Sequence, residues 1–387
     1  MIKKKYILGF AGAVLFSACS TSDDLSIVDS PSVDETKESA LIYEAGQNSE
    51  IPISLGAGQS RGNTRTPLEP GAGGMFSTET GKYLGVFCLA TGYQSSYAST
   101  PPIANKWTND DATGLIVRMK NVPATVTDGN VAFTDHDYYY PISNWMTYNF
   151  YAYYPRQDEA TFTSKGNLVS VKFTAIDGIH DIIWGRAYPD KPDSEQATDH
   201  DPYCANYFRY NPTSEGPQFK FEHKLVQFKF FVKATAAAKD AGAKVTKMSI
   251  SNAIKQLNLV VANKLDTTQN GSLNPAISKT GPLNIKNIKE VDKDKDCFDG
   301  TDAKALTLET SEQEVGYLML PAPPNLPAPE SAGFKYHISG TVKFSDTTEQ
   351  EISIDMEPKT QIPGSDPAEY GFEPGKIYNI LITIDKN

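Results

Sequence analysis

The sequence has few cysteines, no long apolar segment and almost no helix-type hydrophobic periodicity. The apolar run near its amino terminus has roughly ten residues, whereas a bilayer-spanning helix needs about 20. The five histidines are scattered without metal-ligand spacing, and no set of side chains forms a catalytic constellation. We therefore predict no enzyme activity, no metal site and no cofactor.

Beyond the first five positions the basic residues form no cluster. The formal charge is −11, and loss of the three lysines at positions 3 to 5 would leave −14. Nucleic-acid binding needs a basic face that contacts phosphates. The sequence therefore predicts no nucleic-acid partner.

The amino terminus has the features of an export signal. Three lysines precede the short apolar run, and Ser17 and Ala18 stand directly before Cys19. This arrangement resembles the bacterial lipobox. The resemblance implies that residues 1–18 are a signal peptide, that Cys19 receives a diacylglycerol, and that the new amino terminus is acylated, for example with palmitate. Cys19 would then hold the protein on a membrane.

Residues 19–48 are rich in Ser, Asp and Glu as far as about Ser39. Low hydrophobicity and clustered negative charge favour disorder, so we expect a flexible tether. Acidic residues directly after the lipidated cysteine also resemble the surface-export signal of Bacteroidetes lipoproteins. The expected location is therefore the outer face of the outer membrane.

The three remaining cysteines are Cys88, Cys204 and Cys297. An odd number leaves at least one thiol without a disulfide partner. A bridge between Cys204 and Cys297 stays open from the sequence alone.

The body of the chain reads as β-strands separated by turns. Residues 82–89 and 148–154 are apolar on both faces, which is typical of strands buried between two layers. In residues 219–232 the apolar positions switch from odd to even numbers after Leu225, which predicts a bulge or a strand that crosses between sheets. Residues 336–344 and 352–356 alternate around an Asp346-Thr-Thr turn and predict a hairpin. The only helix expected is a short connector within residues 234–243.

These patterns predict an all-β fold. More than 350 residues after the signal exceed one usual core, so we expect two tandem antiparallel β-sandwich domains, the architecture of immunoglobulin-like folds. A loop rich in Asp, Pro and Gly separates two sets of strands. We place the domains at residues 49–215 and 216–387.

Two further motifs have alternative readings. Gly58-Gln-Ser60-Arg-Gly62 matches the serine hydrolase elbow, but no helix pattern follows it, so we interpret it as an exposed loop. Trp107, Trp145 and Trp184 could form an aromatic platform for sugars with residues 138–140. Because all of these aromatic residues lie in or beside predicted strands, we interpret them as core residues.

Several segments together resemble the Mfa-like fimbrillins of Bacteroidetes type V pili. In chain order they are Tyr83–Phe87, Phe150–Pro155, Asp181–Ala187, Phe221–Val226 and Phe372–Asn379. The resemblance implies two transthyretin-like domains, export as a lipoprotein, and assembly into a fimbrium by donor-strand exchange with other pilin subunits. It also implies adhesion to a host or bacterial surface ligand.

In that family a protease cuts after an arginine that follows the first strand. Here the first strand would be Ile51, Ile53 and Leu55, and the candidate sites are Arg61 and Arg65, in a loop of small and polar residues. Loss of the strand would open a groove for a strand of the next subunit. We expect the carboxy-terminal strand, with Tyr378, Ile380, Ile382 and Ile384 on one face, to take part in this exchange.

The sequence ends soon after that strand, without an obvious extra donor segment. This favours a tip or anchor subunit over a stalk repeat. An anchor would keep its lipid uncut, and a tip would only receive a donor strand. The alternative function is a surface lipoprotein of the outer membrane that binds glycans.

Overall fold

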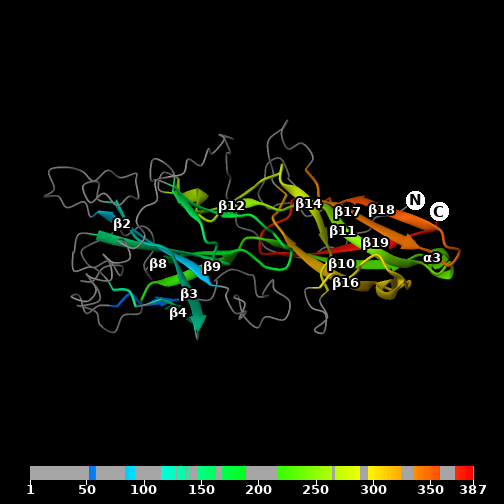
Figure 1. Cartoon of the computed structure of the whole chain (residues 1–387), viewed down its shortest axis with the longest axis horizontal. Coiled ribbons are helices and arrows are strands. Elements are labelled where there is room, and N and C mark those ends of the chain that lie inside the picture. Colours follow the sequence, from blue (N-terminus) through cyan, green and yellow to red (C-terminus); the bar gives the residue numbers. More distant parts are fainter. Residues whose placement is uncertain are drawn as a thin grey trace.

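A computed structural model describes residues 52–57, 83–92, 115–127, 129–135, 137–139, 146–162, 168–188, 216–263, 266–287, 295–323, 334–357 and 371–386. These residues form an elongated, almost entirely β structure. The strands that come early in the sequence lie at one end, and the carboxy-terminal strands lie at the other (Figure 1). The predicted all-β class is confirmed.

The amino-terminal end is a closed barrel of seven strands in the order β1-β4-β3-β2-β5-β8-β9. The strands are β1 (Leu55–Gly56), β2 (Leu84–Gly92), β3 (Leu115–Thr127), β4 (Asn130–Phe133), β5 (Met146–Tyr154), β8 (Ile183–Tyr188) and β9 (Gln218–His223). Neighbouring strands are antiparallel except β1 and β9, which run parallel. The barrel therefore closes where the first and the last of its strands meet.

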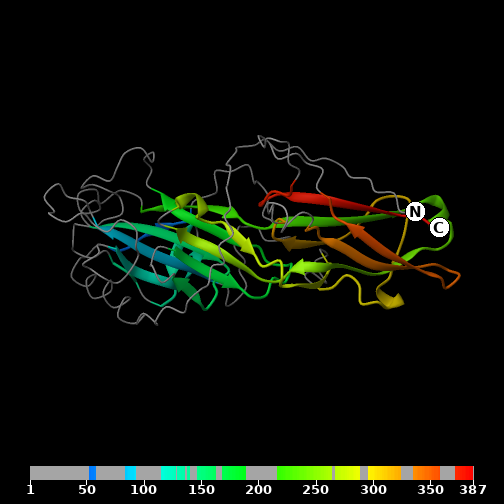
Figure 2. The same cartoon turned by 90° about the horizontal axis from the view of Figure 1, so that it is seen from above.

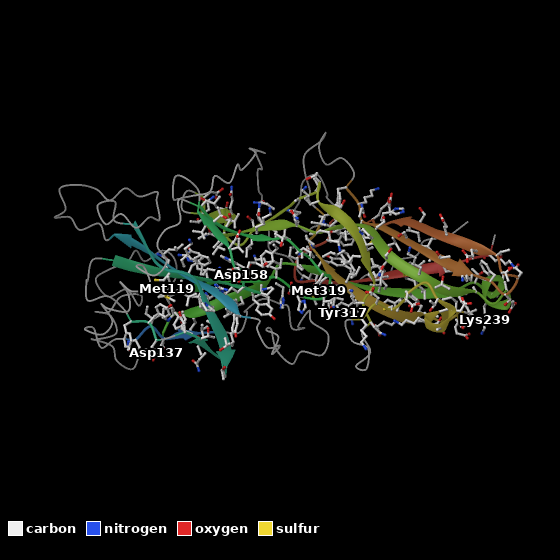
Figure 3. All side chains as sticks on the ribbon, viewed as in Figure 1. Met119, Asp137, Asp158, Lys239, Tyr317 and Met319 are labelled. Atoms are coloured by element: carbon white, nitrogen blue, oxygen red, sulfur yellow. The ribbon has the colours of Figure 1, made fainter. Side chains whose placement is uncertain are left out.

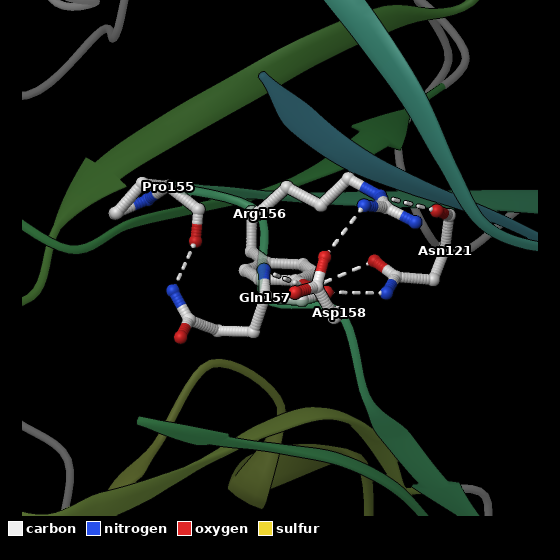
Figure 4. Close-up of polar contacts among 6 residues, drawn as sticks. Asn121, Pro155, Arg156, Gln157 and Asp158 are labelled. Carbon is white, nitrogen blue, oxygen red and sulfur yellow. Dashed lines mark hydrogen bonds and ion pairs between the residues drawn. The ribbon is translucent and has the colours of Figure 1, made fainter. Parts of the chain in front are cut away.

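A bulge in β3 curves the sheet towards closure. Val86 pairs with Val122 and Cys88 with Met119, so β3 has one more residue than β2 in this interval. Within it Asn121 has a positive φ of 53°. Its side chain accepts from the Tyr153 hydroxyl at 2.7 Å and donates to the Gln157 carbonyl at 2.6 Å, and Arg156 donates to its carbonyl at 2.8 Å (Figure 4). The turn after β5 thus holds the bulge.

The central strands of the barrel are buried on both faces, as predicted for residues 82–89 and 148–154. One face of β2 and β5 points into the barrel core, with Val86, Cys88, Phe150 and Ala152. The other face packs outside the barrel, with Phe87, Leu89, Tyr151 and Tyr153. A second layer must therefore cover the barrel on this side.

That layer is a four-stranded sheet in the order β13-β12-β7-β6. It contains β6 (Ala160–Phe162), β7 (Leu168–Phe173), β12 (Leu257–Asn263) and β13 (Leu273–Pro275). β7 and β12 are antiparallel partners although about 90 residues separate them. Trp184 of the barrel donates its indole N–H to the Val261 carbonyl at 2.9 Å. Strands from both sides of residue 216 therefore share this sheet, and β9 likewise pairs with β8 in the barrel.

Two further sheets form the carboxy-terminal end. One has the order β16-β10-β19, and the other has the order β14-β11-β17-β18 with β15 paired to β11. Their strands are β10 (Val226–Ala234), β11 (Lys244–Ile254), β14 (Thr280–Asn284), β15 (Leu306–Thr307), β16 (Gln313–Leu320), β17 (His337–Lys343), β18 (Glu349–Asp355) and β19 (Ile377–Ile384). Figure 2 shows the two sheets extending from the barrel along the long axis. Apolar residues of both belong to one core.

Short helical segments connect these strands. The helix α3 (Ala236–Asp240) follows β10, and Thr235 caps it by accepting from the Ala238 N–H at 3.3 Å. Single 3₁₀ turns occur at Thr267–Gln269 and Asp302–Lys304. Lys239 of α3 lies at the far end from Met119 of the barrel, with Tyr317 and Met319 of β16 between them (Figure 3). The predicted connector helix is confirmed.

The predicted phase switch in residues 219–232 is a crossing between sheets. Phe219 and Phe221 of β9 point into the barrel core, whereas Leu225 and the alternating residues of β10 point into the carboxy-terminal core. The hairpin of β17 and β18 is confirmed as well. Two tandem sandwiches are not confirmed, because the amino-terminal strands close into a barrel and sheet pairing continues across residue 216.

A buried contact between an aspartate and a histidine fixes this crossing. Asp181 is fully buried, and one of its carboxylate oxygens contacts His223 Nδ1. The other oxygen accepts from the Ile182 and Leu225 amides at 2.8 and 3.2 Å. Burial raises the pKa of Asp181 above its ordinary value, and this effect outweighs the opposing hydrogen bonds from His223 and the two amides. The pair thereby joins the segment before β8 to the segment between β9 and β10.

Asp177 stabilises the loop that leads from β7 to β8. It accepts from the Ile179 and His180 amides at 2.8 and 3.1 Å and also contacts His180 Nδ1. Although burial opposes the charged form, the hydrogen bond and charge of His180 and these amides lower the pKa of Asp177 to about 2. Its charged form is therefore favoured in the folded protein.

We predict that Asp181→Ala lowers the free energy of unfolding by about 3 kcal/mol, because it leaves His223 and the amides of Ile182 and Leu225 buried without their acceptor. The matched control is Asp355→Ala, which removes a half-exposed partner of His337 and should cost at most about 1 kcal/mol. Urea titration followed by tryptophan fluorescence measures both variants. Similar losses in the two variants would contradict a structural role for the buried pair.

Acid should remove the contribution of Asp177. Because its folded pKa lies below the ordinary value, its stabilisation is complete above about pH 4 and disappears as the pH falls towards 2. The side chain is 44% exposed, so solvent screening limits the effect to about 1 kcal/mol. The difference in unfolding free energy between wild type and Asp177→Asn, measured from pH 6 to pH 2, should shrink over this range. A constant difference would refute the assignment.

Candidate functional site: the first strand of the barrel

The strand β1 lies between β4 and β9 and closes the barrel. Leu55 pairs with Val131 and Gly56 with Asn130 in the antiparallel direction, and Gly56 also pairs with Gln218 in the parallel direction. In Figure 1 β1 is the short blue strand beside β4. We call the space that β1 occupies, between β4 and β9, the slot.

Backbone hydrogen bonds hold β1 along both sides of the slot. The Ile53 N–H donates to the Tyr138 carbonyl at 2.7 Å, and the Ala57 N–H donates to the Gly129 carbonyl at 2.7 Å. On the opposite side the Gly56 N–H donates to the Pro217 carbonyl at 3.0 Å. Residues 52–57 are therefore a complete sheet member, although the regular strand has only two residues.

Two side chains of this segment fill the barrel core. Ile53 and Leu55 are 6% and 1% exposed, whereas Pro52 and Ser54 between them face solvent. This alternation is the one expected from the sequence. Burial of each apolar side chain contributes roughly 1.5–3 kcal/mol. Loss of the segment would expose the core and leave β4 and β9 with unpaired edges.

On the β9 side of the slot, residues 54–56 lie very close to residues 216–218. A Cβ atom at position 216 would overlap the backbone carbonyl of Ser54. A Cβ atom at position 56 would overlap the side-chain amide of Gln218. The Gln218 Nε2 donates to the Gly216 carbonyl at 3.0 Å, which holds that amide in place. Residue patterns alone do not predict these contacts, and the two glycines beside predicted strands are the available signal.

Other predicted residues of the exchange site lie outside the described residues. They are Cys19, Ile51, Arg61 and Arg65. Both arginines follow β1 in the sequence, between the described residues 52–57 and 83–92. A cut at either position would separate β1 from the rest of the barrel.

The predicted carboxy-terminal strand is β19, which lies in the chain's own carboxy-terminal sheet. It runs parallel to β10 over eight register pairs, from Gln227 with Ile377 to Ala234 with Ile384. Ile380, Ile382 and Ile384 are buried in the carboxy-terminal core. Tyr378 packs edge-on against Phe372 with ring centroids 5.0 Å apart. The strand is thus the edge strand of the sheet β16-β10-β19, and its isoleucines pack into the chain's own core.

Three of the aromatic residues that could have formed a sugar platform are described, and two of them are buried, whereas Tyr139 is half-buried. Trp184 is 4% exposed and Tyr138 is 1% exposed. Trp107 and Trp145 lie outside the described residues. Trp184 and Tyr138 therefore pack the core.

Ser60 of the hydrolase-like motif lies outside the described residues. A different Ser–His–Asp arrangement occurs on β17 and β18. His337 Nδ1 lies 2.9 Å from Asp355 Oδ1, and His337 Nε2 lies 3.2 Å from Ser353 Oγ. Catalytic triads use a buried carboxylate, whereas the Asp355 side chain is 51% exposed. We interpret these contacts as cross-strand pairs on a solvated sheet face.

The described part of the chain has neither a metal-binding cluster nor a membrane-spanning helix. It contains no cluster of three or more His, Cys, Asp or Glu side chains that could hold a metal ion. None of its helices has the length and apolar character needed to cross a membrane.

The relationship of this chain to known proteins follows from its match to one protein family. The model of the family described as fimbrillin-like matches residues 78–387, which is most of the chain. The chain belongs to the fimbrillin-like family. This membership supports a fimbrial or adhesive subunit that associates with other subunits at the cell surface.

Solved structures resemble this fimbrillin-like chain at low identity. A candidate cell adhesion protein from Bacteroides uniformis ATCC 8492 has 14% identity and a TM-score of 0.40, with 87% of this chain and 94% of that chain covered. A second, from Bacteroides ovatus ATCC 8483, has 14% identity and a TM-score of 0.40, with 86% and 92% covered. The fimbrial anchor protein Mfa2 from Porphyromonas gingivalis has 7% identity and a TM-score of 0.29, with 79% and 83% covered. No curated protein matches the sequence.

We predict that Gly216→Ala loosens β1 selectively, because the new methyl group overlaps the Ser54 carbonyl. Overpacking of this kind costs about 1–3 kcal/mol. Amide hydrogen exchange at Gly56 and Ala57 should accelerate, while exchange in β10 and β19 stays unchanged. The control is Gly281→Ala, whose nearest atom is 3.7 Å away on the flexible Lys255 side chain. Equal acceleration in both variants would contradict the contact.

Proposed function

We propose that this fimbrillin-like protein is a structural or adhesive subunit of a type V pilus whose slot exchanges β1 for a strand of a neighbouring subunit. It would reach the outer membrane as a lipoprotein acylated at Cys19. Cleavage at Arg61 or Arg65 would then release the lipid and β1 together. The observation that carries the proposal is that β1 alone closes the barrel and directly precedes both arginines.

The physics of the slot supports exchange with another strand. Backbone groups of β4 and β9 need partners, and the core needs side chains at the positions of Ile53 and Leu55. A strand from another chain can satisfy both requirements at once. An empty slot would leave an apolar core open to water, so cleavage provides the driving force for assembly.

A tip or anchor role is favoured over a stalk repeat. The strand β19 is paired along its length with β10, and its isoleucines fill the carboxy-terminal core. Donating that strand would open a second apolar core within the same molecule. A subunit that receives a strand but keeps β19 corresponds to a tip, and one that keeps Cys19 and β1 corresponds to an anchor.

Limited digestion with an arginine-specific protease tests the proposal. We expect one early cut, at Arg61 or Arg65, followed by association of the product with partner subunits in size-exclusion chromatography. Arg156 is an internal control, because its Nε donates to the Asn121 carbonyl at 2.8 Å within the folded barrel. The double variant Arg61→Ala/Arg65→Ala should resist the early cut and remain unassociated.

Two results would count against the proposal. An early cut at Arg156 in place of the predicted loop would show that the barrel opens elsewhere. A product that is cut at Arg61 or Arg65 but associates no better than the uncut double variant would show that β1 release does not create a binding site. Resistance of the wild-type loop to the protease would favour the anchor role.

A further inference from the structure

We infer that the slot selects a strand with the pattern apolar residue, any residue, apolar residue, glycine. The side chain of Gln218 sets the requirement for glycine at the last position. This inference rests on the proposed function, because it names the strand that the slot accepts. The partner is therefore a β-strand of a different chain, and this chain's own β19 is disfavoured.

The inward positions of the slot set the apolar part of the pattern. Ile53 and Leu55 contribute to the barrel core together with residues of β2, β5 and β9. Ser54 between them is exposed, so its side chain is not selected. A strand with aliphatic residues at the first and third positions would fill the same space.

Gln218 sets the requirement at the next position. It lies directly beside Gly56 in the parallel pair, and its side-chain amide occupies the space into which any Cβ at position 56 would project. The hydrogen bond from Nε2 to the Gly216 carbonyl fixes the amide there. A larger residue at this register must break that bond and turn Gln218 away. Because the obstructing atoms are the end of a flexible side chain, the penalty should be moderate.

The strand β19 satisfies the apolar part of the pattern but not the glycine. Its alternating residues are Tyr378, Ile380, Ile382 and Ile384. In the direction of β1, the residue after each apolar pair is Leu381, Thr383 or Asp385. In the opposite direction it is Leu381, Asn379 or Ile377. Every alignment therefore places a side chain against Gln218.

A double-mutant cycle on the intact chain tests the Gln218 contact without any cleavage. Gly56→Ala should lower the urea midpoint of the wild type, and this drop should be at least halved in the Gln218→Ala background. Effects of the new alanine on the unfolded chain cancel in the cycle. Equal drops in both backgrounds would overturn the inference.

A peptide experiment tests selection by the opened slot. The protein is cut with the arginine-specific protease, and fluorescent peptides compete for the slot in an anisotropy assay. The peptides carry the sequence of residues 51–57, the same sequence with leucine at the Gly56 position, and the sequence of residues 377–386. We expect the glycine peptide to bind about tenfold more tightly than the other two. Binding of either of those peptides breaks the hydrogen bond from Gln218 Nε2 to the Gly216 carbonyl.

The variant protein separates the possible outcomes. In Gln218→Ala the three affinities should converge to within about threefold. If glycine and leucine peptides bind equally well to the wild type, the selection is wrong and the proposed exchange function stands. If the cut protein binds none of the peptides, the slot does not open and both proposals fail.

Discussion

The architecture of the amino-terminal end depends on the hydrogen bonds of one short strand. β4 and β9 are not neighbours of each other, and among the described strands only β1 supplies backbone partners to both. Without it the barrel has two open edges and a core that lacks Ile53 and Leu55. A sheet edge with unpaired N–H and C=O groups binds other strands readily. Closure of the barrel and readiness for strand exchange therefore have the same physical origin.

Contacts that do not involve β1 stabilise the rest of the barrel. The outer faces of β2 and β5 pack on β7 and β12, so the barrel wall opposite to the slot is covered by a second layer. The buried pair of Asp181 and His223 fixes the chain where β9 leaves the barrel and β10 enters the carboxy-terminal sheets. β1 has no comparable second layer on Pro52 and Ser54, which face solvent.

Much of the local structure could be predicted from the sequence. The switch of apolar phase around Leu225 correctly indicated a crossing between sheets, and the two-faced apolar strands were correctly expected between two layers. The partners of these strands could not be predicted. The pairing of β7 with β12 joins segments about 90 residues apart, and β19 pairs with β10 in parallel. Alternation of side chains shows which face of a strand is buried, but several sheets can satisfy the same alternation.

The candidate site divides in the same way. The sequence by itself determined that Ile53 and Leu55 share an inward face, that Arg61 and Arg65 follow them, and that the chain belongs among β-rich fimbrillin-like proteins, because these properties depend on local order and composition. Only the tertiary structure decided that this segment closes a barrel between β4 and β9, and that Gln218 covers Gly56. Both facts depend on contacts between residues more than 70 positions apart, which form only when the whole sheet has assembled.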